Sequence, residues 1–301
     1  MPTHHFLLRR IAVLLLPLAA LLSAPSPAWS PETEGPRGHL IIVGGGDTPP
    51  EAQQRFVELA GGPGRARIAL FPMASVSGNE EADEAAEELA RLGAEVHIVD
   101  LDRDSAQAEH NAMKLSGMSG FWFCGGDQTR LATILRDTPA LNSVQRRYYE
   151  GAVVGGTSAG AAVMSRRMLT GKHQSETGDA SRLPPIARNL IETDDGFGFL
   201  PGAIVDQHFL QRSRHNRLLS AVLERPGSLG IGIDEGTALL VRPDRRWEVI
   251  GDSYVKIFDA RRARIAPSET QVIGSSDITM HLLPGGSLYD PISGQTVLPA
   301  L

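Results

Sequence analysis

A serine between closely spaced glycines is the part of this sequence best suited to covalent chemistry. Residues 156–160 (GTSAG) match the pattern G-x-S-x-G and lie between the apolar runs 152–154 and 161–164. This order predicts a buried strand, a sharp turn and a helix, with the hydroxyl of Ser158 standing clear of its own backbone. Glycines let neighbouring backbone approach such a turn, and N–H groups at the start of the helix can stabilise an oxyanion. The alternative is a turn of small residues without catalysis.

A serine hydroxyl becomes nucleophilic when a base takes its proton, and that base needs an orienting acid. His208 follows an apolar strand pattern and comes two residues after Asp206, which makes it a better candidate base than His215 in the helix that follows. Asp234 and Glu235 end another apolar segment and are the candidate acids. The residues alone leave the choice between these two carboxylates open. A structural histidine and a plain acidic turn are the alternatives.

Strands and helices alternate along the part of the chain that carries these residues. Strands are predicted at 39–43, 67–73, 95–101, 120–124, 152–154, 203–208 and 230–235, and helices at 50–60, 79–92, 105–115, 128–135 and 212–224. This alternation predicts right-handed crossovers and a parallel sheet covered on both faces. Ligands of such sheets bind beyond the carboxyl ends of the strands, so the turn 125–128 and the serine turn are expected to face one crevice.

Other segments depart from this alternation. The glycine turn at 44–47 (GGGD) is not a dinucleotide-binding fingerprint, because its third glycine would fall at Pro49. Residues 170–199 are irregular, which predicts a long excursion or lid. From Thr237 the pattern is antiparallel, and residues 270–301 are predicted to add hairpins to the same domain, whose main part is 39–269.

The first 28 residues have the pattern of a secretory signal peptide. Arg9 and Arg10 precede an apolar run at 11–22, and small residues follow as far as Ala28. We expect cleavage after Ala28 or Ala24 and export to the periplasm or the extracellular space. An uncleaved anchor is the alternative. Residues 29–38 are then predicted to be a flexible lead-in.

Composition excludes several classes of function. The formal net charge of the 301 residues is −6 and becomes −8 when Arg9 and Arg10 leave with the signal peptide, which argues against nucleic acid as a partner and is compatible with a basic substrate. Cys124 is the only cysteine, which excludes an intramolecular disulfide and a zinc site built on cysteines. It ends an apolar strand, so we predict a buried thiol with no catalytic role.

Four motifs in this order resemble the cyanophycinases, serine exopeptidases related to the aspartyl dipeptidases. They are residues 125–128 (GGDQ), 155–161 (GGTSAGA), 206–209 (DQHF) with Arg212 and Arg217 downstream, and 230–235 (GIGIDE). The resemblance implies a flavodoxin-like α/β fold of the class I glutamine amidotransferase type, with a mainly parallel sheet and helices on both faces; the C-terminal antiparallel hairpins are predicted from the strand and turn pattern alone. It also implies a Ser-His-Glu triad, which falls on Ser158, His208 and Glu235.

The resemblance further implies a substrate and the groups that bind it. The substrate is cyanophycin, a polyaspartate with arginine on each β-carboxylate, cut to β-Asp-Arg dipeptides through an acyl-enzyme on Ser158. Neither a metal nor an organic cofactor is implied. The mature form is not expected to contact a membrane, and the family suggests a homodimer. The oxyanion hole falls on the N–H groups of Gly126 and Ala159, and substrate binding on Asp127, Gln128, Asp206, Gln207, Arg212 and Arg217.

Two other functions remain open from the sequence. One is a periplasmic dipeptidase of the same family that cleaves aspartyl or isoaspartyl peptides. The other is a binding domain of the amidotransferase type without catalysis. For the arginines, the alternative to substrate binding is a solvated helix face.

Overall fold

The computed structural model describes residue 1 and residues 35–76, 80–173, 185–266 and 270–300, so residues 2–28 of the predicted signal peptide lie outside the described ranges. Gly35–Leu301 forms one compact unit. The end of the predicted lead-in is fixed to this unit, because the N–H groups of Arg37 and Gly38 donate to the carbonyl oxygens of Tyr149 and Tyr148 at 3.3 and 2.9 Å.

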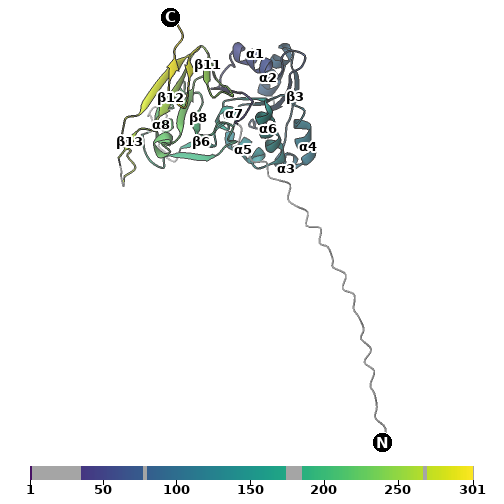
Figure 1. Ribbon diagram of the computed structural model, residues 1–301, viewed down its shortest axis with the longest axis horizontal. Coiled ribbons are helices and arrows are strands. Elements are labelled where there is room, and N and C mark those ends of the chain that lie inside the picture. The colour runs from purple at the N-terminus through teal and green to yellow at the C-terminus, as the bar shows by residue number, and fades with distance from the viewer. Residues whose placement is uncertain (2–34, 77–79, 174–184, 267–269, 301) are drawn as a thin grey trace. The chain divides into compact units, whose positions relative to one another are not determined.

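The main sheet has nine strands in the order β17-β16-β11-β10-β1-β5-β4-β2-β3. Figure 1 labels two of them, β11 and β3. The five strands from β1 to β3 in this order are parallel, and those from β10 to β17 extend the sheet in antiparallel fashion. Their bounds are β1 Leu40–Val43, β2 Arg67–Phe71, β3 Glu95–Ile98, β4 Gly120–Phe123, β5 Val153–Thr157, β10 Thr237–Val241, β11 Trp247–Gly251, β16 Leu288–Tyr289 and β17 Thr296–Val297. β1, β4 and β5 are buried along their whole length, because both faces of the sheet are covered.

Helices cover the two faces separately. α1 (Pro50–Leu59) and α2 (Glu80–Arg91) pack against side chains such as Ile41 and Trp122 on one face. α3 (Arg103–Gln107), α4 (Glu109–Leu115), α5 (Gln128–Leu135) and α6 (Pro139–Glu150) pack against Ile42 and Phe121 on the other. Successive strand residues point to opposite faces, so one strand supplies both clusters. The predicted mainly parallel sheet with helices on both faces and antiparallel strands after it is confirmed.

A second sheet carries part of the chain that the sequence had suggested for the parallel sheet. It contains β15 (Thr279–Pro284), β12 (Tyr254–Asp259), β9 (Leu229–Ile233) and β8 (Ala203–Asp206) in that order, with β8 and β9 parallel. α8 (His215–Glu224) packs on it through the buried cluster of Phe209, Leu218 and Val222. The chain returns to the main sheet at the corner between β9 and β10. An apolar strand pattern predicts a strand but not the sheet it joins.

Three local expectations were wrong or incomplete. The stretch predicted as irregular contains β6 (Arg167–His173) and β7 (Ile191–Asp195), which pair in antiparallel fashion. α6 was not predicted, and the helix expected at 105–115 is divided between α3 and α4 at Ala108. The C-terminal residues contribute β15 to the second sheet and β16 and β17 to the edge of the main sheet, and a further pair joins β13 (Arg264–Ile265) to β14 (Ser275–Ser276).

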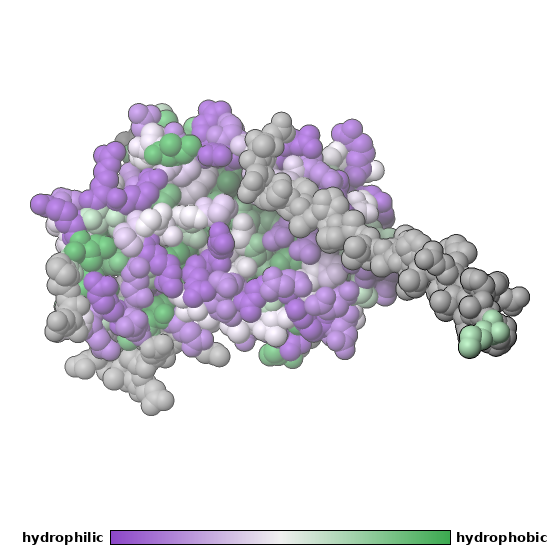
Figure 2. Space-filling model, turned by 60° about the horizontal axis from the view of Figure 1, so that its bottom comes forward, coloured by the Kyte–Doolittle hydropathy of each residue, from purple (hydrophilic) through white to green (hydrophobic). Residues whose placement is uncertain are grey.

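Hydrophilic residues predominate on the face shown in Figure 2, with apolar residues scattered among them. In the part of the chain that the structure describes, no helix combines the length and the apolarity needed to cross a bilayer.

Candidate active site

Ser158 stands on a strained turn between β5 and α7 (Ala159–Ala162), with φ 52° and ψ −107°. Two glycines make this turn feasible. A Cβ on Gly160 would lie 2.1 Å from the carbonyl oxygen of Phe123, and one on Gly156 would lie 2.8 Å from the carbonyl oxygen of Gly160. The predicted strand, turn and helix are therefore present. α7 is a single turn, however, so the helix dipole contributes less to an oxyanion site than a long helix would.

Ser158, His208 and Glu235 form one chain of hydrogen bonds. Ser158 Oγ lies 2.8 Å from His208 Nε2, and His208 Nδ1 lies 2.5 Å from Glu235 Oε1. With Nδ1–H donating to the carboxylate, Nε2 is free to accept the serine proton. The candidate nucleophile, base and orienting acid are thus hydrogen-bonded in the order that acyl transfer needs.

Asp234 has a different role from its neighbour Glu235. Its Oδ1 accepts the N–H groups of Leu210 and Gln211 at 2.9 and 3.2 Å, and its Oδ2 accepts the Ser253 hydroxyl at 2.8 Å. These bonds fix the turn that follows His208. The geometry therefore gives Glu235 the contact with histidine and Asp234 the support of its turn.

The glycine turn after β1 presses against this pair of side chains. A Cβ on Gly45 would lie 2.2 Å from His208 Cε1, and one on Gly46 would lie 3.2 Å from Glu235 Cβ. The N–H of His208, whose φ is 46°, donates to the Gly44 carbonyl at 2.6 Å. The sequence alone did not connect residues 44–46 to the triad. Their three consecutive glycines were the signal that this turn lies close to other groups.

Gly126 and Ala159, the predicted oxyanion donors, follow adjacent parallel strands. Phe123 of β4 pairs with Gly156 of β5, so both turns lie at the same edge of the sheet. Within the described residues, neither N–H has a hydrogen-bond acceptor. This leaves both groups available to a ligand.

Two contacts hold the Gly126 turn. Glu81 Oε1 accepts the N–H of Gly125 at 2.9 Å, and the Ala74 carbonyl accepts the N–H of Asp127 at 2.9 Å. A Cβ on Gly126 would lie 2.3 Å from the Ala74 oxygen. Glu81 could not be recognised from the sequence, because one acid among many in α2 carries no distinguishing signal.

Asp206 and Arg217 bind each other in the interior. Arg217 Nε lies 2.7 Å from Asp206 Oδ2, and Nη2 contacts Oδ1, with the residues 3% and 1% exposed. Gln207 is also buried, and its Oε1 accepts from Arg214 Nη1. This arrangement differs from the predicted binding of substrate by Asp206, Gln207 and Arg217, because their polar groups already have partners and little access to solvent.

The remaining predicted binding residues have different environments: one caps a helix, one is buried, and one is exposed. Asp127 Oδ1 caps α5 by accepting the N–H groups of Thr129 and Arg130 at 2.7 and 3.2 Å. Gln128 is buried and donates to the Leu169 carbonyl of β6 at 2.9 Å. Arg212 is exposed, and its charge acts on His208.

Burial lowers the pKa of His208 below its usual value of 6.5. The bond from Glu235 opposes this change, and the charges of Arg212 and Arg214 add to it. His208 is therefore neutral near pH 7 and able to accept a proton. Burial also raises the pKa of Cys124, with Glu81 contributing, and the thiol is 2% exposed, as predicted for a structural cysteine. Among the residues described, no cluster of His, Cys, Asp or Glu side chains is arranged to hold a metal ion.

Comparison with known proteins identifies relatives over most of the chain. A cyanophycinase of Geminocystis herdmanii is 34% identical over 267 residues, which are 84% of this chain and 94% of that protein. A cyanophycinase of Trichormus variabilis is 32% identical over 273 residues, 87% of this chain and 88% of that protein.

Solved structures of peptidases share the fold. A peptidase from an acI-B1 Actinobacterium has a TM-score of 0.59 and 25% identity, covering 81% of this chain and 98% of its own. A putative peptidase E protein from Listeria monocytogenes, at a TM-score of 0.52 and 16% identity over 72% of this chain and 99% of its own, supports the fold alone. The model of Peptidase family S51 matches residues 40–248. The chain therefore belongs to this family and is a serine peptidase.

Proposed function

We propose that this chain is an exported exopeptidase that hydrolyses cyanophycin to β-Asp-Arg dipeptides through an acyl-enzyme on Ser158. The observation that carries the proposal is the hydrogen-bonded chain from Ser158 Oγ through His208 to Glu235, with spans of 2.8 and 2.5 Å. Relatives named cyanophycinase, 31–34% identical over 84–89% of the chain, support the choice of substrate.

In the acylation step, Ser158 Oγ attacks the carbonyl carbon of an aspartyl backbone peptide while His208 Nε2 takes the hydroxyl proton. The carbonyl oxygen gains the charge and accepts the N–H groups of Gly126 and Ala159. Glu235 stabilises the imidazolium through Nδ1–H without itself taking a proton. Collapse of the tetrahedral intermediate breaks the C–N bond, and His208 delivers its proton to the leaving amine.

Deacylation repeats these steps with water as the nucleophile. His208 Nε2, neutral again, removes a proton from a water molecule that attacks the ester carbon, and it then returns the proton to Ser158 Oγ. The released acid is the dipeptide product. The lowered pKa of His208 keeps this base unprotonated at the start of both steps.

Arg212 is the predicted substrate-binding residue best placed to meet a ligand. It is exposed, and no other described residue forms an ion pair with it, while its charge already reaches His208. A guanidinium in this position can hold a substrate carboxylate by two parallel hydrogen bonds. We assign it the carboxylate next to the scissile bond.

Product analysis tests the reaction and the nucleophile together. Purified wild type and the Ser158→Ala variant are incubated with insoluble cyanophycin, and soluble products are identified by mass spectrometry. We expect β-Asp-Arg from wild type and none from Ser158→Ala, with the exposed Ser116→Ala variant as a matched control that behaves as wild type. Equal release by wild type and Ser158→Ala contradicts the serine mechanism. Cleavage of aspartyl or isoaspartyl dipeptides without polymer hydrolysis favours the dipeptidase alternative.

The proposed export rests on residues 1–28, with Arg9, Arg10 and the apolar run that follows. N-terminal sequencing of the protein recovered outside the cytoplasm tests it, and we expect a start at Pro25 or Trp29, the residues that follow the two expected cleavage points. A start at Met1 contradicts cleavage.

A further inference from the structure

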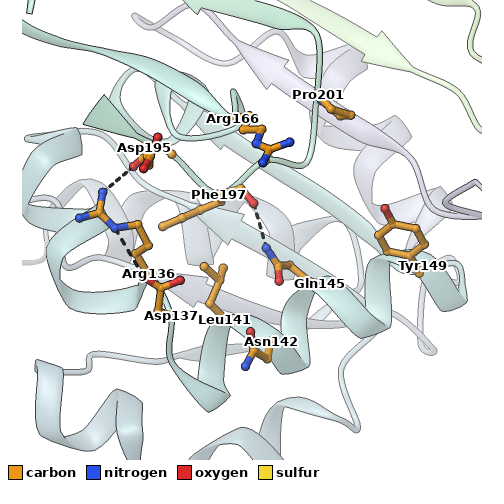
Figure 3. A pocket seen from close by; sticks show the side chains of 12 residues that line it. Arg136, Asp137, Leu141, Asn142, Gln145, Tyr149, Arg166, Asp195, Phe197 and Pro201 are labelled. Atoms are coloured by element: carbon orange, nitrogen blue, oxygen red, sulfur yellow. Dashed lines mark hydrogen bonds and ion pairs between the residues drawn. The ribbon is translucent and has the colours of Figure 1, made fainter. Parts of the chain in front are cut away.

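A cavity of about 630 Å³ lies between α6 and the chain that follows β7 (Figure 3). Its lining includes none of the triad and none of the turns that support it. The volume lies in the range of ordinary small-ligand sites.

Hydrogen bonds between separate segments preform the walls of this cavity. Arg136 Nη1 donates to Asp194 Oδ1 and to the Asp195 carbonyl at 3.0 and 2.9 Å, and Gln145 Nε2 donates to the Phe197 carbonyl at 2.8 Å. Phe197 is 3% exposed, and its ring centre lies 5.2 Å from that of Phe123 in the core. A preformed site loses little conformational entropy when a ligand binds.

Two opposite charges in the cavity are left for a ligand. Arg166 is exposed, and its guanidinium has no hydrogen bond or ion pair to any described residue. The Asp137 side chain is 87% exposed, and its ion-pair contact is one at 3.9 Å with Arg136 Nε. Figure 3 shows Arg166 and Asp137 on opposite sides of Phe197. A ligand with a single kind of charge would therefore leave one of the two unpaired.

We propose that this cavity is a second binding site for the Asp-Arg polymer, distinct from the site of cleavage. The inference rests on the proposed function for the identity of the polymer. Each polymer unit carries one carboxylate and one guanidinium, so Arg166 takes the carboxylate in a bidentate pair and Asp137 takes the guanidinium. A second attachment raises the effective concentration of polymer ends at the triad. Two linked attachments of this kind raise the overall affinity by roughly 10²- to 10⁴-fold.

Sedimentation with insoluble polymer measures this binding without cleavage. Ser158→Ala protein, alone or combined with Arg166→Glu, is mixed with increasing polymer, and the free protein is quantified. We expect Arg166→Glu to weaken apparent affinity at least roughly tenfold. Arg262→Glu, at an exposed arginine outside the cavity, is the control and should bind as Ser158→Ala does. Unchanged affinity of the Arg166→Glu protein overturns the proposal.

Asp137→Asn provides an independent variant, since asparagine tolerates the left-handed backbone of this position, where φ is 57°. It should weaken polymer binding in the same assay, and normal binding by Asp137→Asn contradicts the role of its charge. Melting temperatures of both variants that match that of the parent protein would exclude misfolding as the cause of weaker binding.

Kinetics separate this inference from the proposed function. In the active enzyme, Arg166→Glu should raise KM for insoluble polymer far more than KM for a soluble peptide of two Asp-Arg units, which offers few units for a second attachment. Equal losses on the two substrates overturn the second site. If the polymer binds in a manner that depends on Arg166 but wild type does not hydrolyse it, the proposed function is contradicted and the second binding site is supported.

Discussion

At the scale of single residues, the environment of His208, the proposed base, sets the acid limit that we expect for catalysis. Its pKa lies below 6.5 because of burial, and the positive charge of Arg212 lowers it further. The base form therefore persists to lower pH than it would in a free histidine, and kcat/KM falls only as pH drops through this lowered pKa.

Replacing Arg212 with glutamine should move this limit. Loss of the positive charge raises the pKa of His208, so the acid limb of the kcat/KM profile shifts to higher pH. Profiles of wild type and Arg212→Gln from about pH 4.5 to 8, which brackets the usual histidine pKa, measure the shift, with Arg262→Gln as an exposed control. A limb that stays in place or moves to lower pH would show that this charge does not reach His208.

Adjacent carboxylates at the sheet corner should respond differently to removal of their charge. Glu235→Gln keeps the length of the side chain but loses the negative charge, and its NH₂ group can donate to Nδ1 and so favour the wrong tautomer of His208. We therefore expect kcat to fall by roughly 10³- to 10⁴-fold. Asp234→Asn keeps an oxygen for the N–H groups of Leu210 and Gln211 and should lose much less activity. Steady-state kinetics on one substrate compare them, and a larger loss in Asp234→Asn would reverse the assignment.

At the scale of elements, α2 contacts the candidate active site through a hydrogen bond of Glu81. Glu81 accepts the N–H of Gly125 and so orients the turn that presents Gly126. Removing an oxyanion donor lowers kcat by about 10²- to 10³-fold. A misplaced donor lowers kcat by less, because it keeps part of the stabilisation.

Glu81→Ala should therefore lower kcat with little change in KM, and Glu81→Gln, which retains a carbonyl acceptor, should restore most of it. Single-turnover and steady-state rates for both variants test this, together with their melting temperatures. If glutamine is as damaging as alanine, the negative charge and not the hydrogen bond is what matters at this position.

The element scale also shows what sequence could and could not predict. Patterning located most strands and helices, and the motifs named Ser158, His208 and Glu235, which the structure joins by hydrogen bonds. The choice between Asp234 and Glu235 needed the direction of each side chain, which a turn determines through its backbone angles. The pairing of Asp206 with Arg217 could not be foreseen, because the sequence does not reveal which charged side chains are buried.

At the scale of the whole molecule, the Asp206–Arg217 pair links α8 to β8 in the interior of the second sheet. Arg217→Met leaves the carboxylate of Asp206 buried with a more distant cation, Arg214 at 3.7 Å. Breaking a buried pair in this way destabilises proteins by about 3–5 kcal/mol.

Urea denaturation should show a loss of this size for Arg217→Met, while Arg262→Met stays within about 0.5 kcal/mol of wild type. Combining Arg217→Met with Asp206→Asn should recover part of the stability, because the second change removes the uncompensated charge. A loss of less than about 1 kcal/mol in Arg217→Met would mean that the pair contributes little beyond surface charges.

Because the proposed triad is divided between two sheets, we expect hydrolytic activity to begin only late in folding. Ser158 follows β5 of the main sheet, whereas His208 and Glu235 follow β8 and β9 of the second. A growing chain that has been synthesised only as far as Pro201 contains the proposed nucleophile but neither its base nor its acid. With the proposed triad, partly synthesised molecules are therefore inactive, and hydrolysis begins only after the last third of the polypeptide has folded against the first two thirds.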